Sequence, residues 1–321
     1  MKVLVIGASG FVGRHLIDAL VATQTISVTA ASRNSITFSS AITQISLPRD
    51  YRKLSKDVEL NLFASVDVVF LLAAATPSLL AGRSVDEKRR ALDTNINMPL
   101  FLARAAHRQG IKHIIFLSSC GVHGAVSELG AFSETSPYNG HDPYTRSKIA
   151  AEQLLLSNSA NLPALTIVRP PSVYGFGARG PVRLLMRLVE KQWPLPFGAA
   201  TKNSRQFIGV RNLCDFLVTC VRKDTAKGEI FLVADQERVS ARELLDAIAT
   251  AGNLRSRQFN VPVGLLSNMS KFIGMGSQMN RLLGNYEIDI SKSKSKLGWS
   301  PPYTMMDELR EIYKFGGATV N

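Results

Sequence analysis

Cysteines, long apolar runs and blocks of like charge are all scarce in this sequence. Three of the 321 residues are cysteines, Cys120, Cys214 and Cys220, and their odd number and spacing fit neither a zinc site nor a disulfide framework. The longest uninterrupted apolar run, residues 68–75, is far below the ~18 apolar residues of a membrane-spanning helix. The apolar run before Gly7 is too short for a signal peptide. We therefore expect a reduced, cytoplasmic protein with no integral membrane segment and no metal site.

The chain is basic, with 38 Lys and Arg against 25 Asp and Glu and a formal net charge of +13. Such an excess can indicate a nucleic-acid-binding protein. Here the excess is spread over both halves of the chain, without a zinc-finger spacing, an aromatic RNA-binding motif or a basic arm. We therefore predict no nucleic-acid partner and favour the attraction of small anionic ligands as the role of the charge.

Short apolar runs alternate with stretches of helical periodicity, a pattern typical of a parallel sheet built from βαβ units. The predicted strands are residues 2–6, 26–31, 67–72, 112–117 and 164–168, and the predicted helices are 11–22, 92–109 and 147–158. After Pro170-Pro171 the pattern changes, with helices at 182–191 and 241–251 and a strand at 230–233. We predict an α/β fold with a Rossmann doubly wound parallel sheet in residues 1–170. We expect residues 171–321 to form mainly a smaller substrate-binding α/β lobe, with about 205–235 returning to the sheet.

A glycine-rich turn lies between the first predicted strand and the first predicted helix. It reads Gly7-Ala8-Ser9-Gly10-Phe11-Val12-Gly13. Glycines at this spacing permit a tight turn, a close approach of the backbone to a pyrophosphate and close packing of helix on strand. The context of strand, turn and helix makes a dinucleotide-binding site the preferred interpretation.

The end of the second strand indicates which dinucleotide is bound. NAD sites place a carboxylate there to accept hydrogen bonds from the ribose, whereas this strand ends in Ala31-Ser32-Arg33-Asn34. Ser32 and Arg33 suit a 2′-phosphate instead. We expect NADP(H) to be preferred, with NAD(H) possible.

Two polar motifs indicate carbonyl chemistry. Tyr144 and Lys148 are four residues apart on a predicted helix and therefore share a face, where an ammonium lowers the pKa of a phenol. Ser118-Ser119 follows a buried strand, at the edge where an open α/β sheet holds its ligand. A phenol and a serine hydroxyl together can transfer a proton to a substrate oxygen and orient it.

These motifs together resemble the extended short-chain dehydrogenase/reductase family, the NAD-dependent epimerase/dehydratase group that acts mainly on nucleotide-diphosphate sugars. The matching segments are residues 7–13, 72–75, Asn95, 116–124, 142–148, 169–175 and 297–302. The resemblance implies that Ser119, Tyr144 and Lys148 are catalytic. It implies a cofactor site of Gly7, Ser9, Gly10, Phe11, Val12, Gly13, Ser32, Arg33, Leu72, Ala73, Ala74, Ala75, Asn95, Ser118, Tyr144, Lys148 and Pro170. The implied substrate contacts are Ser119, Cys120, Tyr144, Ser172 and Arg205, with Arg205 on the diphosphate.

Three reactions use this set of residues. Dehydratases of the family follow the catalytic hydroxyl residue with an Asp-Glu pair, whereas Cys120-Gly121 stands here, which argues against a dehydratase. Residues 180–188, 195–198, 204–210 and 289–292 look like bacterial enzymes that reduce a UDP-linked 4-keto-6-deoxy-N-acetylhexosamine for surface-polysaccharide synthesis. A UDP-hexosamine 4-epimerase with tightly bound NAD is the second interpretation, and a non-catalytic dinucleotide-sensing scaffold is the third. The resemblance also makes a homodimer possible.

Cys120 and residues 264–283 each allow two interpretations. Cys120 suits a small buried apolar position better than a nucleophile. Residues 264–283 mix apolar side chains with Lys271 and Arg281, a pattern that fits either a helix packed within the second lobe or a segment lying on anionic lipid. We favour packing within the lobe.

Overall fold

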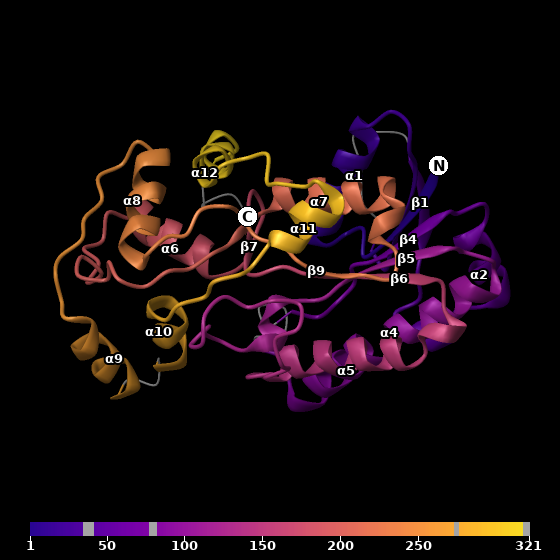
Figure 1. Cartoon of the computed structure of the whole chain (residues 1–321), viewed down its shortest axis with the longest axis horizontal. Helices are drawn as coiled ribbons and strands as arrows, with labels where there is room; N and C mark the ends of the chain where they lie inside the picture. The colour runs from indigo at the N-terminus through magenta and orange to yellow at the C-terminus, as the bar shows by residue number, and fades with distance from the viewer. Residues whose placement is uncertain (35–41, 77–81, 273–275, 317–321) are drawn as a thin grey trace.

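Seven parallel strands form one sheet in the computed structural model, which describes residues 1–34, 42–76, 82–272 and 276–316 (Figure 1). The order across the sheet is β3 (Thr43–Ser46), β2 (Ser27–Ser32), β1 (Lys2–Ile6), β4 (Val68–Leu71), β5 (His113–Leu117), β6 (Ala164–Arg169) and β9 (Ile230–Leu232). The chain reverses its direction of travel across the sheet between β1 and β4, where doubly wound folds bind their ligand. The predicted Rossmann α/β fold is confirmed.

The first strand shows why the sheet is buried on both faces. Val3 and Val5 pack into one apolar core with α1 (Phe11–Ala22) and α7 (Val210–Arg222). Leu4 and Ile6 point the other way, into a second core with three further helices. Those helices are α2 (Lys56–Phe63), α4 (Val85–Arg108) and α5 (Pro143–Ser157). Because both faces of such a strand contact an apolar core, its sequence is a continuous apolar run, which is the pattern that residues 2–6 show.

Two helices begin earlier than their apolar periodicity predicts. α4 begins at Val85 rather than Leu92, because Ser84 and Glu87 form a capping box ahead of a polar first part of the helix. α5 begins at Pro143, where Asp142 caps it through the Thr145 amide at 2.8 Å. This start agrees with the predicted placement of Tyr144 and Lys148 on one helix, whereas the apolar periodicity begins only at Ser147. The polar first turns carry no apolar stripe, so only the cap residues mark where these helices start.

The second lobe lies at the opposite end of the molecule from α2 (Figure 1). Its own apolar core joins α6 (Pro181–Glu190), α8 (Ala241–Ala251) and α12 (Met305–Lys314). Further elements are α9 (Val263–Phe272), α10 (Gly276–Leu283), α11 (Ser291–Leu297) and the short parallel pair β7 (Val173–Tyr174) and β8 (Ile208–Gly209). Within the described ranges, no helix combines the length and apolarity needed to cross a bilayer.

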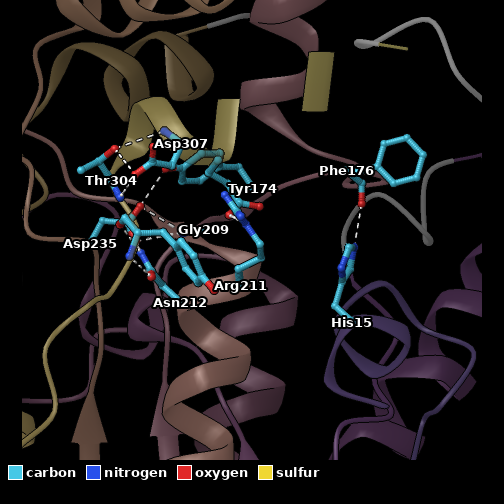
Figure 2. A network of polar contacts seen from close by, with 11 residues as sticks. His15, Tyr174, Phe176, Gly209, Arg211, Asn212, Asp235, Thr304 and Asp307 are labelled. Carbon is cyan, nitrogen blue, oxygen red and sulfur yellow. Dashed lines mark hydrogen bonds and ion pairs between the residues drawn. The ribbon is translucent and has the colours of Figure 1, made fainter. Parts of the chain in front are cut away.

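A buried carboxylate holds the second lobe to the sheet. Asp235, three residues after β9, accepts hydrogen bonds from the Gly209 amide at 3.0 Å, the Asn212 amide group at 2.7 Å and the Tyr174 hydroxyl at 2.8 Å. Figure 2 shows these groups converging on it. Burial raises the pKa of Asp235 to about 6, against the opposing effect of the Asn212 hydrogen bond. The network joins β7, β8 and α7 around the carboxyl end of β9.

Candidate active site

The glycine-rich turn has the geometry of a dinucleotide-binding loop. Gly7 has a φ of +98°, which only glycine adopts readily, and a Cβ there would lie 2.6 Å from the Ala73 nitrogen. A Cβ on Gly13 would lie 2.3 Å from the Gly7 carbonyl oxygen. Any side chain at these positions would push α1 and the loop after β4 away from the turn.

The start of α1 suits a phosphate. Gly10 stands at the N-cap, its amide donates to the Gly7 carbonyl at 2.9 Å, and no described side chain caps this end. The first amides of a helix have no intrahelical acceptor, and the helix dipole favours an anion beside them. Ser9, Phe11 and Val12 are partly accessible around this end. The turn therefore fits the pyrophosphate of a dinucleotide.

The end of β2 lies directly against this turn. The Ala31 carbonyl accepts the amides of Gly7 at 3.0 Å and Ala8 at 3.2 Å. Ser32 follows, half-buried, with its hydroxyl on the Asn34 carbonyl, and the Arg33 side chain is exposed. A serine and an arginine thus occupy the position at which a carboxylate would meet an NAD ribose.

Lys148 is buried on the inner face of α5. Its ammonium donates to the Leu117 carbonyl at 2.7 Å and lies 4.6 Å from the centre of the Phe116 ring. Burial lowers the pKa of Lys148 to about 8, although the Glu152 carboxylate acts in the opposite direction. The lysine therefore remains mostly charged at neutral pH and lies at the carboxyl end of β5.

Tyr144 lies one helical turn before Lys148 and is half-buried. Burial raises the pKa of its phenol above the ordinary value, and the Asp142 carboxylate raises it further. We expected Lys148 to lower this pKa, and that expectation is wrong for this structure because the ammonium is bonded to the Leu117 carbonyl. The phenol is therefore protonated at neutral pH, which is the form that donates a proton.

The two serines after β5 differ in their surroundings. The Ser119 hydroxyl accepts the Gly121 amide at 3.1 Å and caps the short turn Cys120–His123, and Ser119 is half-buried. The Ser118 hydroxyl is buried and has no hydrogen-bond partner among the described residues. A buried orphan hydroxyl carries a desolvation cost that a polar ligand group would remove. The turn at Gly7 and this hydroxyl are both compatible with a bound dinucleotide.

Asn95 connects the loop after β4 to α5. Its buried side chain accepts from the Ala75 amide at 2.7 Å and donates to the Ala75 carbonyl at 3.0 Å. It also donates to the Ser147 hydroxyl at 3.3 Å, and that hydroxyl donates to the Tyr144 carbonyl at 2.6 Å. Asn95 thereby positions Tyr144 and the partly accessible loop of Leu72, Ala73, Ala74 and Ala75.

A buried ion pair beneath the site was missed by sequence reasoning. Glu152 lies two helical turns after Tyr144, and its carboxylate accepts from the Arg169 guanidinium at 2.5 Å. Arg169 also reaches the Tyr138 hydroxyl at 3.0 Å and the His123 ring at 3.1 Å. Both charged groups are almost fully buried. The pair ties α5 to the end of β6 and to the segment that follows Ser119.

Arg205 lies in the second lobe. Its guanidinium lies 5.1 Å from the centre of the Tyr286 ring and donates a hydrogen bond to the Gly284 carbonyl at 2.8 Å. Burial lowers its pKa to about 10, and the charge of Arg281 acts in the same direction. No carboxylate within the described residues forms an ion pair with Arg205, whereas Arg281 pairs with Asp142 at 3.0 Å. Arg281, which the sequence indicated only as part of residues 264–283, thus lies near Arg205 with its own charge paired to Asp142.

The other expected substrate and cofactor contacts differ in accessibility. Ser172 is exposed, and Pro170 is buried with its carbonyl accepting the Cys120 amide at 2.8 Å. Cys120 is fully buried in a small core with Tyr286 and Ile288, and burial raises the pKa of its thiol to about 12. Its side chain packs in that core, and the predicted substrate contact at Cys120 stays a prediction. Among the described residues, no group of His, Cys, Asp and Glu could hold a metal ion.

Known proteins are similar to this chain over nearly its full length. The model of the NAD dependent epimerase/dehydratase family matches residues 3–234. A UDP-glucose 4-epimerase of Vibrio cholerae is 31% identical over 312 residues, which is 97% of this chain and 94% of the relative. An N-acetyl-alpha-D-glucosaminyl-diphospho-ditrans,octacis-undecaprenol 4-epimerase of Escherichia coli O157:H7 is 27% identical over 98% of this chain and 95% of its own. The crystal structure of UDP-glucuronic acid 4-epimerase from Bacillus cereus with NAD has the same fold, with a TM-score of 0.77, 22% identity and 98% of both chains covered.

Proposed function

Because this chain belongs to the NAD dependent epimerase/dehydratase family, we propose that it is an NADP(H)-dependent reductase of a nucleotide-diphosphate sugar. Its proposed substrate is a UDP-linked 4-keto-6-deoxy-N-acetylhexosamine, reduced at C4 for surface-polysaccharide synthesis. The observation that carries the proposal is the end of β2, where Ser32 and Arg33 stand in place of a carboxylate. A phosphorylated dinucleotide that exchanges with solvent is the cofactor of a reductase, whereas an epimerase retains its NAD.

The proton chemistry follows from the side chains around Tyr144. The Tyr144 phenol, held neutral by burial, donates its proton to the carbonyl oxygen while Ser119 holds that oxygen by a hydrogen bond. A bound nicotinamide supplies the hydride that completes the alcohol. The Lys148 ammonium, which donates to the Leu117 carbonyl in this structure, would have to turn towards Tyr144 to stabilise the phenolate that remains there. Neutral phenol and charged lysine are the protonation states that reduction of a carbonyl requires at its start.

A 4-epimerase with tightly held NAD is the second candidate. The names of both relatives support it, since each is a 4-epimerase of a diphosphate-linked sugar. Denaturing the freshly purified protein separates the candidates. Release of a stoichiometric amount of NAD, with conversion of a UDP-hexosamine in the absence of added cofactor, would favour the epimerase. A cofactor-free protein that consumes NADPH only with a keto sugar supports the reductase.

The Arg33 side chain provides a test of the cofactor preference. We expect Arg33→Asp to weaken NADPH binding about 10- to 100-fold, because it removes a charge-assisted hydrogen bond to the 2′-phosphate and adds a like charge. Binding of NADH is expected to be retained or to improve. Fluorescence titration of the two cofactors measures both constants. Arg49→Asp, the same change at an exposed arginine after β3, is the control. An unchanged ratio of the two constants would contradict the assignment.

We also propose that Arg205 and Arg281 bind the diphosphate of the sugar nucleotide, in the lobe formed mainly by residues 171–321. Arg205 lacks a described carboxylate partner and lies near a second arginine, an arrangement that an anion would stabilise. Ser172, exposed at the start of that lobe, remains a proposed sugar contact.

Arg205→Gln is expected to raise the dissociation constant of UDP about tenfold, since it removes one charge-assisted contact to phosphate. The KM of the sugar nucleotide should rise with it, while the affinity for the dinucleotide stays the same. Isothermal titration with UDP and with NADPH measures the two effects separately. Arg238→Gln, at an exposed arginine that pairs with Glu287, is the control. Equal UDP affinity in Arg205→Gln and the parent protein would exclude Arg205 from the diphosphate site.

A further inference from the structure

The outer end of the second lobe exposes large apolar side chains that its fold does not use. We define the end patch by five of them and by four basic residues beside them. The apolar members are Trp193 (56% exposed), Phe259 (49%), Val263 (38%), Leu265 (51%) and Met269 (56%). The basic members are Lys191, Arg255, Arg257 and Lys271. We propose that the end patch binds the surface of an anionic lipid bilayer.

Backbone pairing brings the two chain segments of the end patch together. The amide of Leu195 donates to the Arg257 carbonyl at 2.8 Å, and the amide of Phe259 donates back to the Leu195 carbonyl at 3.0 Å. The Gln192 side chain donates to the Arg255 carbonyl at 3.1 Å. Trp193 and Phe259 therefore belong to neighbouring segments, and α9 begins four residues after Phe259.

Helix α9 has separate inner and outer faces. Leu266 and Ser270 are buried, with Leu266 in the apolar core of the lobe. Leu265 and Met269, one turn apart, face away from that core and are half exposed. The earlier preference for packing within the lobe is correct for the inner face, while the outer face has an apolar surface left over. Ile273 and Met275, which also belong to residues 264–283, lie outside the described residues.

The charge around the end patch is mostly positive. Residues 247–286 contain no Asp or Glu, and they contain Arg255, Arg257, Lys271 and Arg281. Residues 191–214 also lack acidic residues, and the Lys191 ammonium lies 5.6 Å from the centre of the Trp193 ring. Two acidic residues come close in space or sequence, since the Asp246 carboxylate accepts hydrogen bonds from Ser256 and Gln258 and Glu190 precedes Lys191. The four basic members still leave the end patch with a net positive charge.

Anionic lipid is the occupant that matches both properties. Apolar side chains enter the boundary of headgroups and acyl chains, while arginine and lysine meet the phosphates. A tryptophan beside a lysine suits that boundary, because indole is apolar at one end and polar at the other. A second copy of the chain would bring its own basic residues against these, and repulsion opposes that pairing. Attachment to a bilayer through the end patch does not depend on the proposed reaction.

The full chain offers a built-in probe of this contact. Trp193 is exposed, and the second tryptophan, Trp299, is buried against Phe216. Vesicles of phosphatidylcholine mixed with phosphatidylglycerol should shift the Trp193 emission to shorter wavelength and carry the protein into the pellet on centrifugation. Vesicles of phosphatidylcholine alone should do neither, and added salt should release the protein. Absence of pelleting with the anionic vesicles at low salt would overturn the proposal.

Variants locate the contact on the end patch. Leu265→Ser/Met269→Ser should lower the partition coefficient about tenfold, since two exposed apolar side chains are lost from the contact. Arg255→Glu/Lys271→Glu should lower the partition coefficient by at least tenfold. Each basic residue near an anionic membrane raises that coefficient about fivefold, and each reversal of charge replaces this attraction by repulsion. Both residue pairs are exposed, so the melting temperatures should stay close to that of the parent.

Matched substitutions on the dinucleotide-binding lobe are the controls. Leu60→Ser/Leu129→Ser removes two exposed apolar side chains, and Lys56→Glu/Arg222→Glu makes the same change of charge. Both control proteins should bind vesicles as the parent does. Equal loss in patch and control variants would overturn the proposal, because the attraction would then be spread over the whole surface. A dimer in solution that Leu265→Ser/Met269→Ser dissociates, with no effect on vesicle binding, would overturn it in favour of a second copy.

Discussion

Replacing Tyr144 by phenylalanine is expected to lower kcat about 1,000-fold, within the range over which general acid catalysis contributes. The variant loses the proton that the phenol gives to the substrate oxygen, while the ring still fills its place on α5. The raised pKa of the phenol supports this role, since a neutral phenol carries that proton at working pH. Loss of NADPH absorbance with the keto sugar measures the rate, and fluorescence titration measures the dinucleotide affinity, which should stay nearly constant.

A matched control removes a hydroxyl from a tyrosine outside the candidate site. Tyr51 packs edge-on against Phe101 near α4, and Tyr51→Phe should keep the parent kcat. The pH dependence adds a second readout. Lys148 has a pKa lowered to about 8, so its own charge is lost and kcat should fall as the pH rises through that value. Full activity of Tyr144→Phe would exclude Tyr144 as the proton donor.

Arg169→Met is expected to lower the free energy of unfolding by about 3–5 kcal/mol, the cost of leaving one member of a buried ion pair alone. The variant leaves the Glu152 carboxylate fully buried, with the Tyr138 hydroxyl still donating a hydrogen bond to it. It also removes the contacts that hold His123 and the Glu134 carbonyl around the guanidinium. Urea denaturation followed by circular dichroism measures the change.

The control for this prediction is an ion pair at the surface. Arg108 donates to the Glu59 carboxylate at 2.9 Å, and the Arg108 side chain is 54% exposed. Arg108→Met should cost at most about 1 kcal/mol, because solvent screens such pairs. A loss in Arg169→Met no larger than that in Arg108→Met would show that the buried pair does not hold α5 to β6.

Local spacing explains which features the sequence predicts well. The predicted strand at residues 2–6 and the predicted helix at 11–22 agree with β1 and α1. Both have a local sequence pattern, a continuous apolar run and a helical apolar periodicity, and the glycines of the turn mark the boundary between them. Tyr144 and Lys148 fall on one face because four residues make about one helical turn. The strand β3 was missed, since Thr43–Ser46 is short and mostly exposed at the edge of the sheet.

Contacts between distant segments explain what the sequence could not show. Arg169 meets Glu152, Tyr138 and His123, which lie 17, 31 and 46 residues away, and no spacing rule connects them. The bond of Lys148 to the Leu117 carbonyl spans 31 residues and diverts the ammonium that the Tyr-Lys pattern assigned to Tyr144. Three-dimensional packing, rather than pattern, decides which groups these charges meet.

The most direct test follows a label from the cofactor to the sugar. The protein, freed of any bound dinucleotide, is incubated with a UDP-4-keto-6-deoxy-N-acetylhexosamine and NADPH that carries deuterium at both hydrogen positions of C4 of the nicotinamide. Nuclear magnetic resonance of the product locates the label. The account predicts deuterium at C4 of the sugar, in step with the consumption of NADPH, and no product from the Tyr144→Phe protein. Unlabelled product, or an inverted UDP-hexosamine formed without added cofactor, would contradict it.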